Sequence, residues 1–125
     1  EKVADFGPTV IFEDSRQRLW GVLGDLYLIA ESGAVNIQKI DMGAEVLGDR
    51  QNPAAASIAE GPDGSLWIAC QAGVVRRAPD GKIVFYPIEQ KTAYSGVSVI
   101  RADEAGRIWA AHRGSLFVFL PETPG

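Results

Sequence analysis

The stretch "GPDGSLWIAC", residues 61–70, decides the fold because its pattern occurs three times in the chain. It joins a short turn containing an acidic residue to an aliphatic residue and Trp. The same order appears in "DSRQRLWGVL", residues 14–23, and in "DEAGRIWAAH", residues 103–112. We therefore interpret the Trp of each stretch as one structural position that recurs along the chain.

The spacing of these positions indicates a repeat of about one propeller blade. Trp20, Trp67 and Trp109 lie 47 and 42 residues apart, and repeats of about 40 to 45 residues are typical of β-propellers. In each unit an alternating segment precedes the turn, the Trp-bearing strand follows it, and Gly, one spacer and an aliphatic residue begin a third strand. A fourth alternating segment follows in the first two units, at 34–40 and 82–88. Four antiparallel strands make a blade.

We therefore predict an all-β fold, a β-propeller segment of about three four-stranded antiparallel blades, the last of them incomplete. The blades are expected at about 9–40, about 55–88 and about 97–120. Helix is disfavoured because Gly or Pro interrupts every stretch with helical periodicity, and the only helical turn is expected near "NPAAAS", residues 52–57. Fewer than three complete blades cannot close a ring. Either a larger propeller or a second copy must complete it, and residues 1–8 are a candidate outer strand for a last blade.

The composition excludes several classes of partner. The chain has 125 residues, 46% hydrophobic and 22% charged, with a formal net charge of −4 and no cluster of Lys and Arg along one segment. A phosphate backbone needs such a basic stripe, so nucleic acid is excluded. Apolar runs are far shorter than the ~20 residues that span a bilayer, so direct membrane insertion is not expected. The first residue is Glu rather than Met, so we expect a processed or excised piece.

The turn residues have structural explanations. Asp side chains bond back to the backbone of turns, and Gly accepts a positive φ there. We assign this role to Asp14, Asp63, Asp80 and Asp103, with glycines at 64 and 106. The first unit has Gln17 where Gly would stand, which predicts a longer or strained turn. Cys70 is expected to pack as a small buried residue, and the three Trp rings are expected to pack between neighbouring sheets.

Functional residues are expected in the loops between blades, 42–54 and 89–96, and in the hairpins that join the second and third strands. Arginine can donate two parallel hydrogen bonds to an anion, and a Tyr ring can stack on a planar group. These loops are therefore suited to a polar or anionic ligand. The candidate ligand-binding residues are Arg50, Asn52, Tyr94, His112 and Arg113. One His and one Cys exclude a Cys/His zinc cluster, and no Gly-x-Ser-x-Gly elbow or calcium loop occurs, so no catalytic group, metal or cofactor is predicted.

The units resemble the two-component regulator propeller repeat. The resemblance covers residues 9–120 and rests on "FEDSRQRLW" with "GDLYLI", "AEGPDGSLWIAC" with "AGVVRRAPDGK", and "RADEAGRIWAAH" with "GSLFVF". In that family such blades form large propellers in the extracytoplasmic sensing regions of bacterial histidine kinases, hybrid sensors and diguanylate cyclases. The resemblance implies a non-catalytic, periplasmic or extracytoplasmic ligand-sensing segment of a membrane receptor. Its expected partners are a small molecule or peptide and the remaining blades or a second copy.

Two alternatives stay open. The first is a structural or protein-interaction scaffold, which should carry an apolar patch at the loop face and no pocket. The second is an enzyme similar to the streptogramin-cleaving lyase propellers, which have similar Gly-x-Leu-Trp strands and use a histidine base with a metal ion. His112 is the only histidine of this chain.

Overall fold

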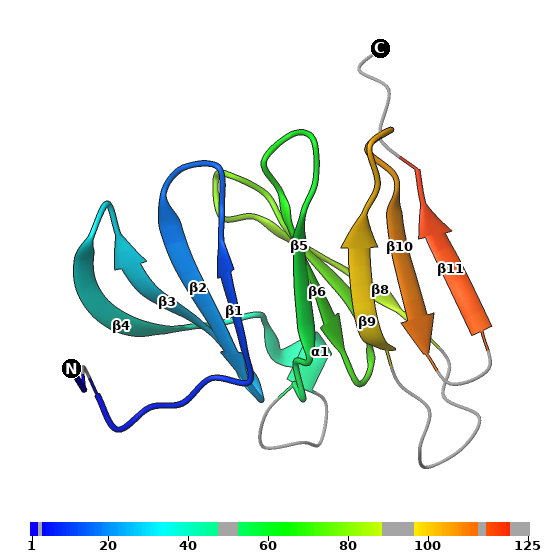
Figure 1. Cartoon of the computed structure of the whole chain (residues 1–125). Helices are drawn as coiled ribbons and strands as arrows, with labels where there is room; N and C mark the ends of the chain where they lie inside the picture. The colour runs from blue at the N-terminus through cyan, green and yellow to red at the C-terminus, as the bar shows by residue number, and fades with distance from the viewer. Residues whose placement is uncertain (3, 48–52, 89–96, 113–114, 121–125) are drawn as a thin grey trace.

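The computed structural model describes residues 1–2, 4–47, 53–88, 97–112 and 115–120, except for the side chains of Glu45, Val97, Ser98 and His112. Eleven strands and one helical turn lie in this part of the chain. The strands form three antiparallel sheets that are consecutive along the sequence (Figure 1). The prediction of an all-β partial propeller is confirmed.

Blade 1 has the strand order β1-β2-β3-β4, each strand pairing with the next along the chain. Its strands are β1 (Val10–Glu13), β2 (Arg18–Leu23), β3 (Asp25–Glu31) and β4 (Ala34–Ile40). Blade 2 has the order β5-β6-β7-β8, with β5 (Ser57–Glu60), β6 (Leu66–Cys70), β7 (Gly73–Arg77) and β8 (Ile83–Pro87). Blade 3 has three strands among the described residues: β9 (Val97–Ala102), β10 (Ile108–His112) and β11 (Ser115–Phe119).

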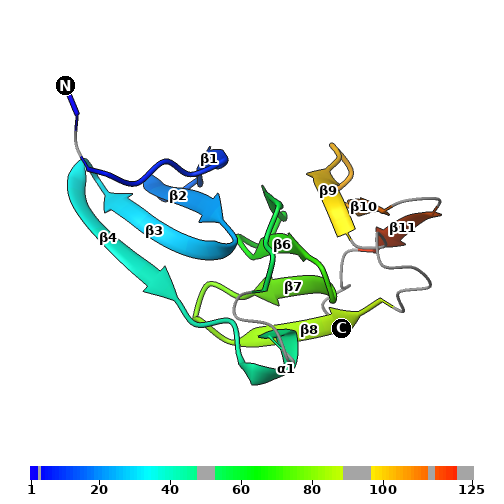
Figure 2. The same cartoon turned by 90° about the horizontal axis from the view of Figure 1, so that it is seen from below.

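The three sheets stand side by side like sectors of a ring. Figure 2 shows them fanned, with β4 and β8 on the outer side and β1 and β9 on the inner side. The first strands are neighbours, since β5 contacts both β1 and β9. We call the end of the blades with the β1–β2, β5–β6, β7–β8 and β9–β10 turns the turn end, and the opposite end the loop end. In Figure 1 the turn end is at the top.

Each sheet alternates its side chains between two faces, so the buried residues divide between two seams. The seam between blades 1 and 2 contains Trp20, Leu26, Ile68 and Val75, with Met42 and Val46 added from the connecting segment. The seam between blades 2 and 3 contains fewer buried residues: Ala59, Trp67, Ala69, Val74, Ile100, Ile108 and Ala110. Burial of these side chains is the main contribution that holds the blades together.

In blades 1 and 2 the Trp side faces the next blade along the chain. Trp20 is fully buried and Trp67 is 7% exposed, each in the seam that follows its own blade. Trp109 pairs in register with Val118 and Arg101, on the opposite face of blade 3 from Ala110, which packs against blade 2. Trp109 is half-buried and lies on a face that no described blade covers.

Two local expectations need correction. Residues 53–57 contain no helical turn, since Ala54 has a φ of 53°, Ala55 forms a β-bridge with Gly24 and Ser57 begins β5, so the helical turn expected near 52–57 is wrong for these residues. The helix is α1 (Ala44–Leu47), which buries Val46 against blades 1 and 2. The first-unit turn is no longer than the others, because Asp14 N bonds Arg18 O as Asp103 N bonds Arg107 O. Gln17 instead adopts a φ of 61°, where Gly64 and Gly106 have 85° and 84°.

Candidate functional site

The predicted ligand residues lie outside the described part of the chain. Arg50, Asn52, Tyr94 and Arg113 fall within 48–52, 89–96 and 113–114. His112 is the last residue of β10, and its side chain is not described either. These five assignments therefore stay predictions.

The described backbone beside them shows which parts of the chain share the loop end. Ala55 N donates to Gly24 O at 2.8 Å, and Gln71 N donates to Pro53 O at 3.2 Å. The segment entering blade 2 therefore lies against the β2–β3 loop of blade 1 and the β6–β7 loop of its own blade. Between-blade and within-blade loops thus meet at one end, as the sequence predicted for a recognition surface.

At the turn end of blade 1, Asp14 organises the turn and the Trp side chain together. Its Oδ1 accepts bonds from Arg16 N and Arg18 N, both at 2.9 Å. Its Oδ2 accepts from Arg18 Nε at 2.7 Å and from Trp20 Nε1 at 2.9 Å. Burial raises the pKa of Asp14, but the bonds from Trp20, Arg18 and Arg16 together outweigh it, so the pKa lies below its usual value. Asp14 is a structural anion.

Blade 3 repeats this arrangement. Asp103 Oδ1 accepts from Ala105 N and Arg107 N at 2.9 Å, and Oδ2 accepts from Arg107 Nε at 2.7 Å and Trp109 Nε1 at 2.8 Å. The Trp109 bond is the largest influence on Asp103 and, with the Arg107 bonds, lowers its pKa to about 2. Each Arg also stacks on its Trp, with Cζ 5.3 Å from the Trp20 centroid and 5.4 Å from the Trp109 centroid.

Blade 2 reaches a similar arrangement with different residues. Gly61 stands where the other turns have Asp, and a Cβ there would lie 2.9 Å from Trp67 Nε1, so the indole occupies the space of the missing carboxylate. Asp63 accepts from Ser65 N and Oγ at 2.9 Å and from Arg76 Nη2 at 2.5 Å. Arg76, from the neighbouring strand, places its Cζ 5.4 Å from the Trp67 centroid.

Sequence reasoning found the turn role of these aspartates but missed the bonds to Trp and Arg. The sequence contains a pattern that could have revealed these bonds. In "DSRQRLW" and "DEAGRIW", Arg follows Asp by four residues and Trp follows Asp by six. The consequence for function is that three carboxylates at the turn end already have donors. None of them is free to act as a general base.

Cys70 is not available for chemistry in the folded state. Its side chain is fully buried in the seam between blades 1 and 2. Burial, with a smaller contribution from the charge of Asp25, raises the pKa of its thiol to about 12. Because the thiolate is the nucleophile, Cys70 is a packing residue at neutral pH.

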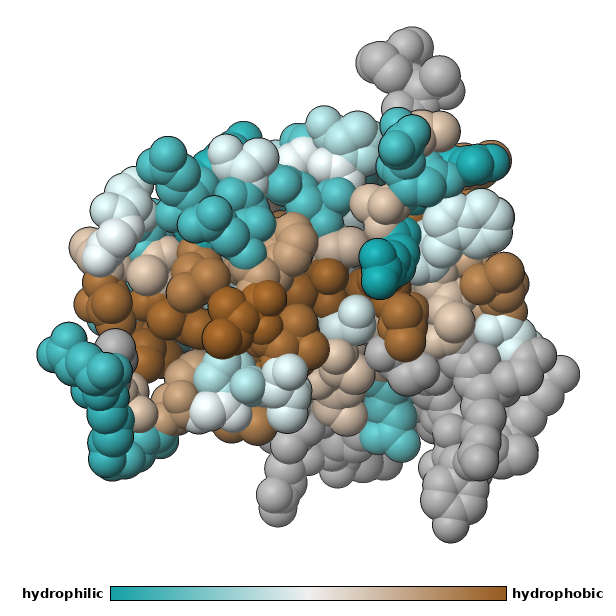
Figure 3. Space-filling view, viewed as in Figure 1, coloured by the Kyte–Doolittle hydropathy of each residue, from teal (hydrophilic) through white to brown (hydrophobic). Residues whose placement is uncertain are grey.

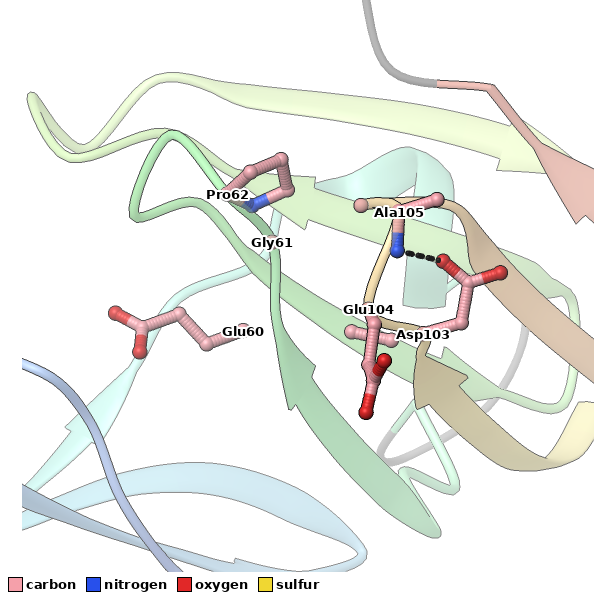
Figure 4. A pocket seen from close by; sticks show the side chains of 8 residues that line it. Glu60, Gly61, Pro62, Asp103, Glu104 and Ala105 are labelled. Carbon is pink, nitrogen blue, oxygen red and sulfur yellow. Dashed lines mark hydrogen bonds between the residues drawn. The ribbon is translucent and has the colours of Figure 1, made fainter.

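A hollow of about 320 Å³ lies at the turn end between blades 2 and 3 (Figure 4). Its lining comes from the two turns 60–62 and 102–106, with the carboxylates of Glu60, Asp103 and Glu104. Asp103 is bonded within its own turn, as the dashed line to Ala105 shows. Glu60 accepts from Ser15 Oγ of blade 1 at 2.7 Å. Two of the three carboxylates are therefore engaged in holding turns and blades.

The described residues contain neither a metal cluster nor a membrane-spanning helix. No group of three or more His, Cys, Asp or Glu side chains there is placed to hold a metal ion. None of the helices in the same residues has the length and apolarity needed to cross a membrane.

Comparison with solved structures supports the fold. The chain is similar to the extracellular domain of BT4673 from B. thetaiotaomicron, described as part of a one-component or hybrid two-component system, with a TM-score of 0.74 and 15% identity. The match covers 92% of this chain and 15% of that one. The chain is also similar to virginiamycin B lyase from Staphylococcus aureus in a catalytically inactive form with quinupristin, with a TM-score of 0.66, 20% identity and coverage of 98% and 45%. No protein-family model and no curated protein matches it.

Proposed function

We propose that this chain is a non-catalytic segment of a ligand-sensing β-propeller in the extracytoplasmic part of a bacterial signal-transduction receptor. The observation that carries the proposal is the likeness of its three blades to part of the extracellular domain of BT4673. The blades supply a rigid support, and the loop end supplies the recognition surface. In this proposal the remaining blades come from the parent protein or from a second copy.

The carboxylates and the thiol that could take part in catalysis already have structural roles, which supports a binding function over a catalytic one. Asp14, Asp63 and Asp103 are bonded to their own turns, and the Cys70 thiol is buried with a raised pKa. The predicted ligand residues, among them Arg50 and Tyr94, are assigned by sequence to the loops between blades. Arginine and Tyr bind anionic and planar groups without chemical change.

The test is thermal unfolding in the presence of saccharide, peptide and organic-acid libraries. A specific ligand at 100 times its dissociation constant should stabilise the fold by about 2.7 kcal/mol. Tyr94→Ala should abolish this shift, whereas Lys39→Ala, an exposed change on the outer strand β4, should leave it intact. If no library member shifts the unfolding temperature, the sensing proposal fails and the scaffold hypothesis takes its place.

A second candidate is a streptogramin-lyase-like enzyme, which the likeness to virginiamycin B lyase favours. The sensing proposal expects quinupristin to stay intact after incubation with the chain, as followed by mass spectrometry. Linearised quinupristin that disappears with His112→Ala would replace the sensing proposal with the enzymatic one. Cleavage that persists in His112→Ala would point to a contaminant.

A further inference from the structure

Three arginines from two blades lie at the turn end of the seam between blades 1 and 2. Arg16 and Arg18 belong to the β1–β2 turn and the start of β2, and Arg77 ends β7. The Cζ atoms of Arg18 and Arg77 each lie 5.3 Å from the centroid of the Trp20 ring. Arg16 reaches across the seam, since its Nη2 lies 3.9 Å from the position of a Cβ on Gly64 of blade 2. Figure 3 shows this upper edge of the molecule as hydrophilic, above an apolar band.

The positive charge at this rim is only partly balanced. Arg18 pairs with Asp14, with Nε 2.7 Å from Oδ2. Asp14 has no capacity left for a second arginine, because both its oxygens already accept two bonds each. No carboxylate within the described ranges forms an ion pair with Arg16 or Arg77.

Arg77 is the unusual member of the group. It is half-buried, and burial, followed by the nearby charge of Arg18, lowers its pKa. The preceding residue of β7 has its counter-charge within its own blade: Arg76 donates to Asp63 at 2.5 Å and to Ser65 Oγ at 3.2 Å. A bound anion would supply Arg77 with the counter-charge that Arg76 obtains from blade 2 itself.

The turn end of the seam between blades 2 and 3 has no arginine at the positions equivalent to Arg77 and Arg16. Arg77 pairs with Leu66, the residue before Trp67. In blade 3 the equivalent position, paired with the residue before Trp109, holds Phe119. The Phe119 ring lies 5.4 Å from that of Trp67. At the sequence position of Arg16, four residues before Trp, blade 2 has Asp63. An aromatic side chain therefore suffices to cover the Trp of a seam, and the arginine cluster is a property of the first seam alone among the described blades.

We propose that this rim binds a small oxyanion, a sulfate, phosphate or carboxylate group, through Arg77, with Arg16 adding positive charge at the same end of the seam. The planar guanidinium donates two parallel bonds to such groups. The rim lies at the turn end, opposite the loop end, so this proposal stands independently of the sensing proposal. A free inorganic ion and an acidic group carried by a saccharide share this chemistry.

The experiment titrates the protein with sodium sulfate at constant ionic strength, balanced with chloride, and follows binding by calorimetry. Arg77→Gln should weaken sulfate binding about tenfold or more, since a charge-assisted bidentate contact is lost. Arg16→Gln should weaken it less, and Arg77→Lys should retain part of it. The matched control Arg101→Gln, an exposed arginine of blade 3, should change the affinity less than about twofold, because it keeps the rim intact.

Parallel titrations with inorganic phosphate, a chondroitin sulfate disaccharide and galacturonate distinguish the sources. Tighter binding of the saccharides than of the inorganic ions would assign the rim to a saccharide-borne group. Equal binding would assign it to the free ion. Absence of binding of all four, or equal weakening by Arg77→Gln and Arg101→Gln, would overturn the proposal. If Arg77→Gln fails to fold, Arg16→Gln decides, because Arg16 is exposed and its removal spares the core.

Discussion

Replacing Asp14 with Ala should be among the most damaging changes of a polar residue in blade 1. The side chain is fully buried and accepts four hydrogen bonds. Its removal leaves the Trp20 N–H without an acceptor inside the seam and deprives Arg18 of its counter-charge. Loss of one partner of a buried charged pair destabilises a protein by about 3 to 5 kcal/mol, so we expect a loss of that order in the free energy of unfolding.

The assay is urea denaturation followed by far-UV circular dichroism, which does not depend on Trp fluorescence. The matched comparison is Asp103→Ala, because Asp103 makes the same four bonds on blade 3 but its side chain is 24% exposed. Water can replace its bonds, so the loss should be clearly smaller. Combining Asp14→Ala with Trp20→Phe should recover about 1 kcal/mol or more relative to additivity, since the orphaned donor is then absent. A loss below about 1 kcal/mol, or one no larger than that of Asp103→Ala, would refute the reasoning.

Four further predictions test other parts of the account. Gln17→Gly should raise the free energy of unfolding by about 1 kcal/mol in the same urea assay, since Gln17 has a φ of 61° that Gly adopts without strain; no gain would mean that the turn is unstrained. Gly73→Ala should lower it by more than about 2 kcal/mol, because its φ is 152° and a Cβ would overlap Tyr86 O; wild-type stability would contradict the β6–β7 loop geometry. Cys70 should react with a thiol reagent only as fast as the protein unfolds, because it is fully buried and burial raises its pKa to about 12; fast labelling of native protein would place it elsewhere. Asp103 has a pKa of about 2 in the folded protein, below the ordinary Asp pKa of about 3.9, so its contribution to stability is complete above the unfolded pKa and lost as the pH falls toward 2; a carbon-detected NMR titration with a midpoint near 4 would contradict the Trp109 bond.

The repeat made the architecture predictable because strand alternation, turn residues and the spacing of Trp all point to the same fold. The helical turn was less predictable. α1 has four residues, too few for a periodic signal, and it forms because Met42 and Val46 bury their side chains in the seam beneath it. The alanines near residue 55 favour helix locally, but Ala55 N bonds Gly24 O of blade 1 instead of a carbonyl within its own segment.

The candidate site was only partly predictable for a related reason. Repeats within the chain identify residues with a structural role, such as the Asp that accepts from Trp in blades 1 and 3, because the same physical requirement returns there. Residues that bind a ligand need not recur from blade to blade, so the predicted ligand residues Arg50 and Tyr94 have no periodic signal to support them. The arginine rim shows the same limitation, since Arg77 replaces a position that holds Phe119 in blade 3.

The central claim is that Trp20 and Trp67 each lie between their own blade and the next. Nuclear Overhauser contacts between the indole of Trp20 and side chains of β7 test it most directly, because the two elements are more than fifty residues apart in sequence. The account predicts contacts from Trp20 to Arg77 and slow exchange of the Trp20 indole proton with solvent, since the ring is fully buried and bonded to Asp14. A Trp20 indole that exchanges freely and contacts blade 1 alone would contradict the stacking of the blades.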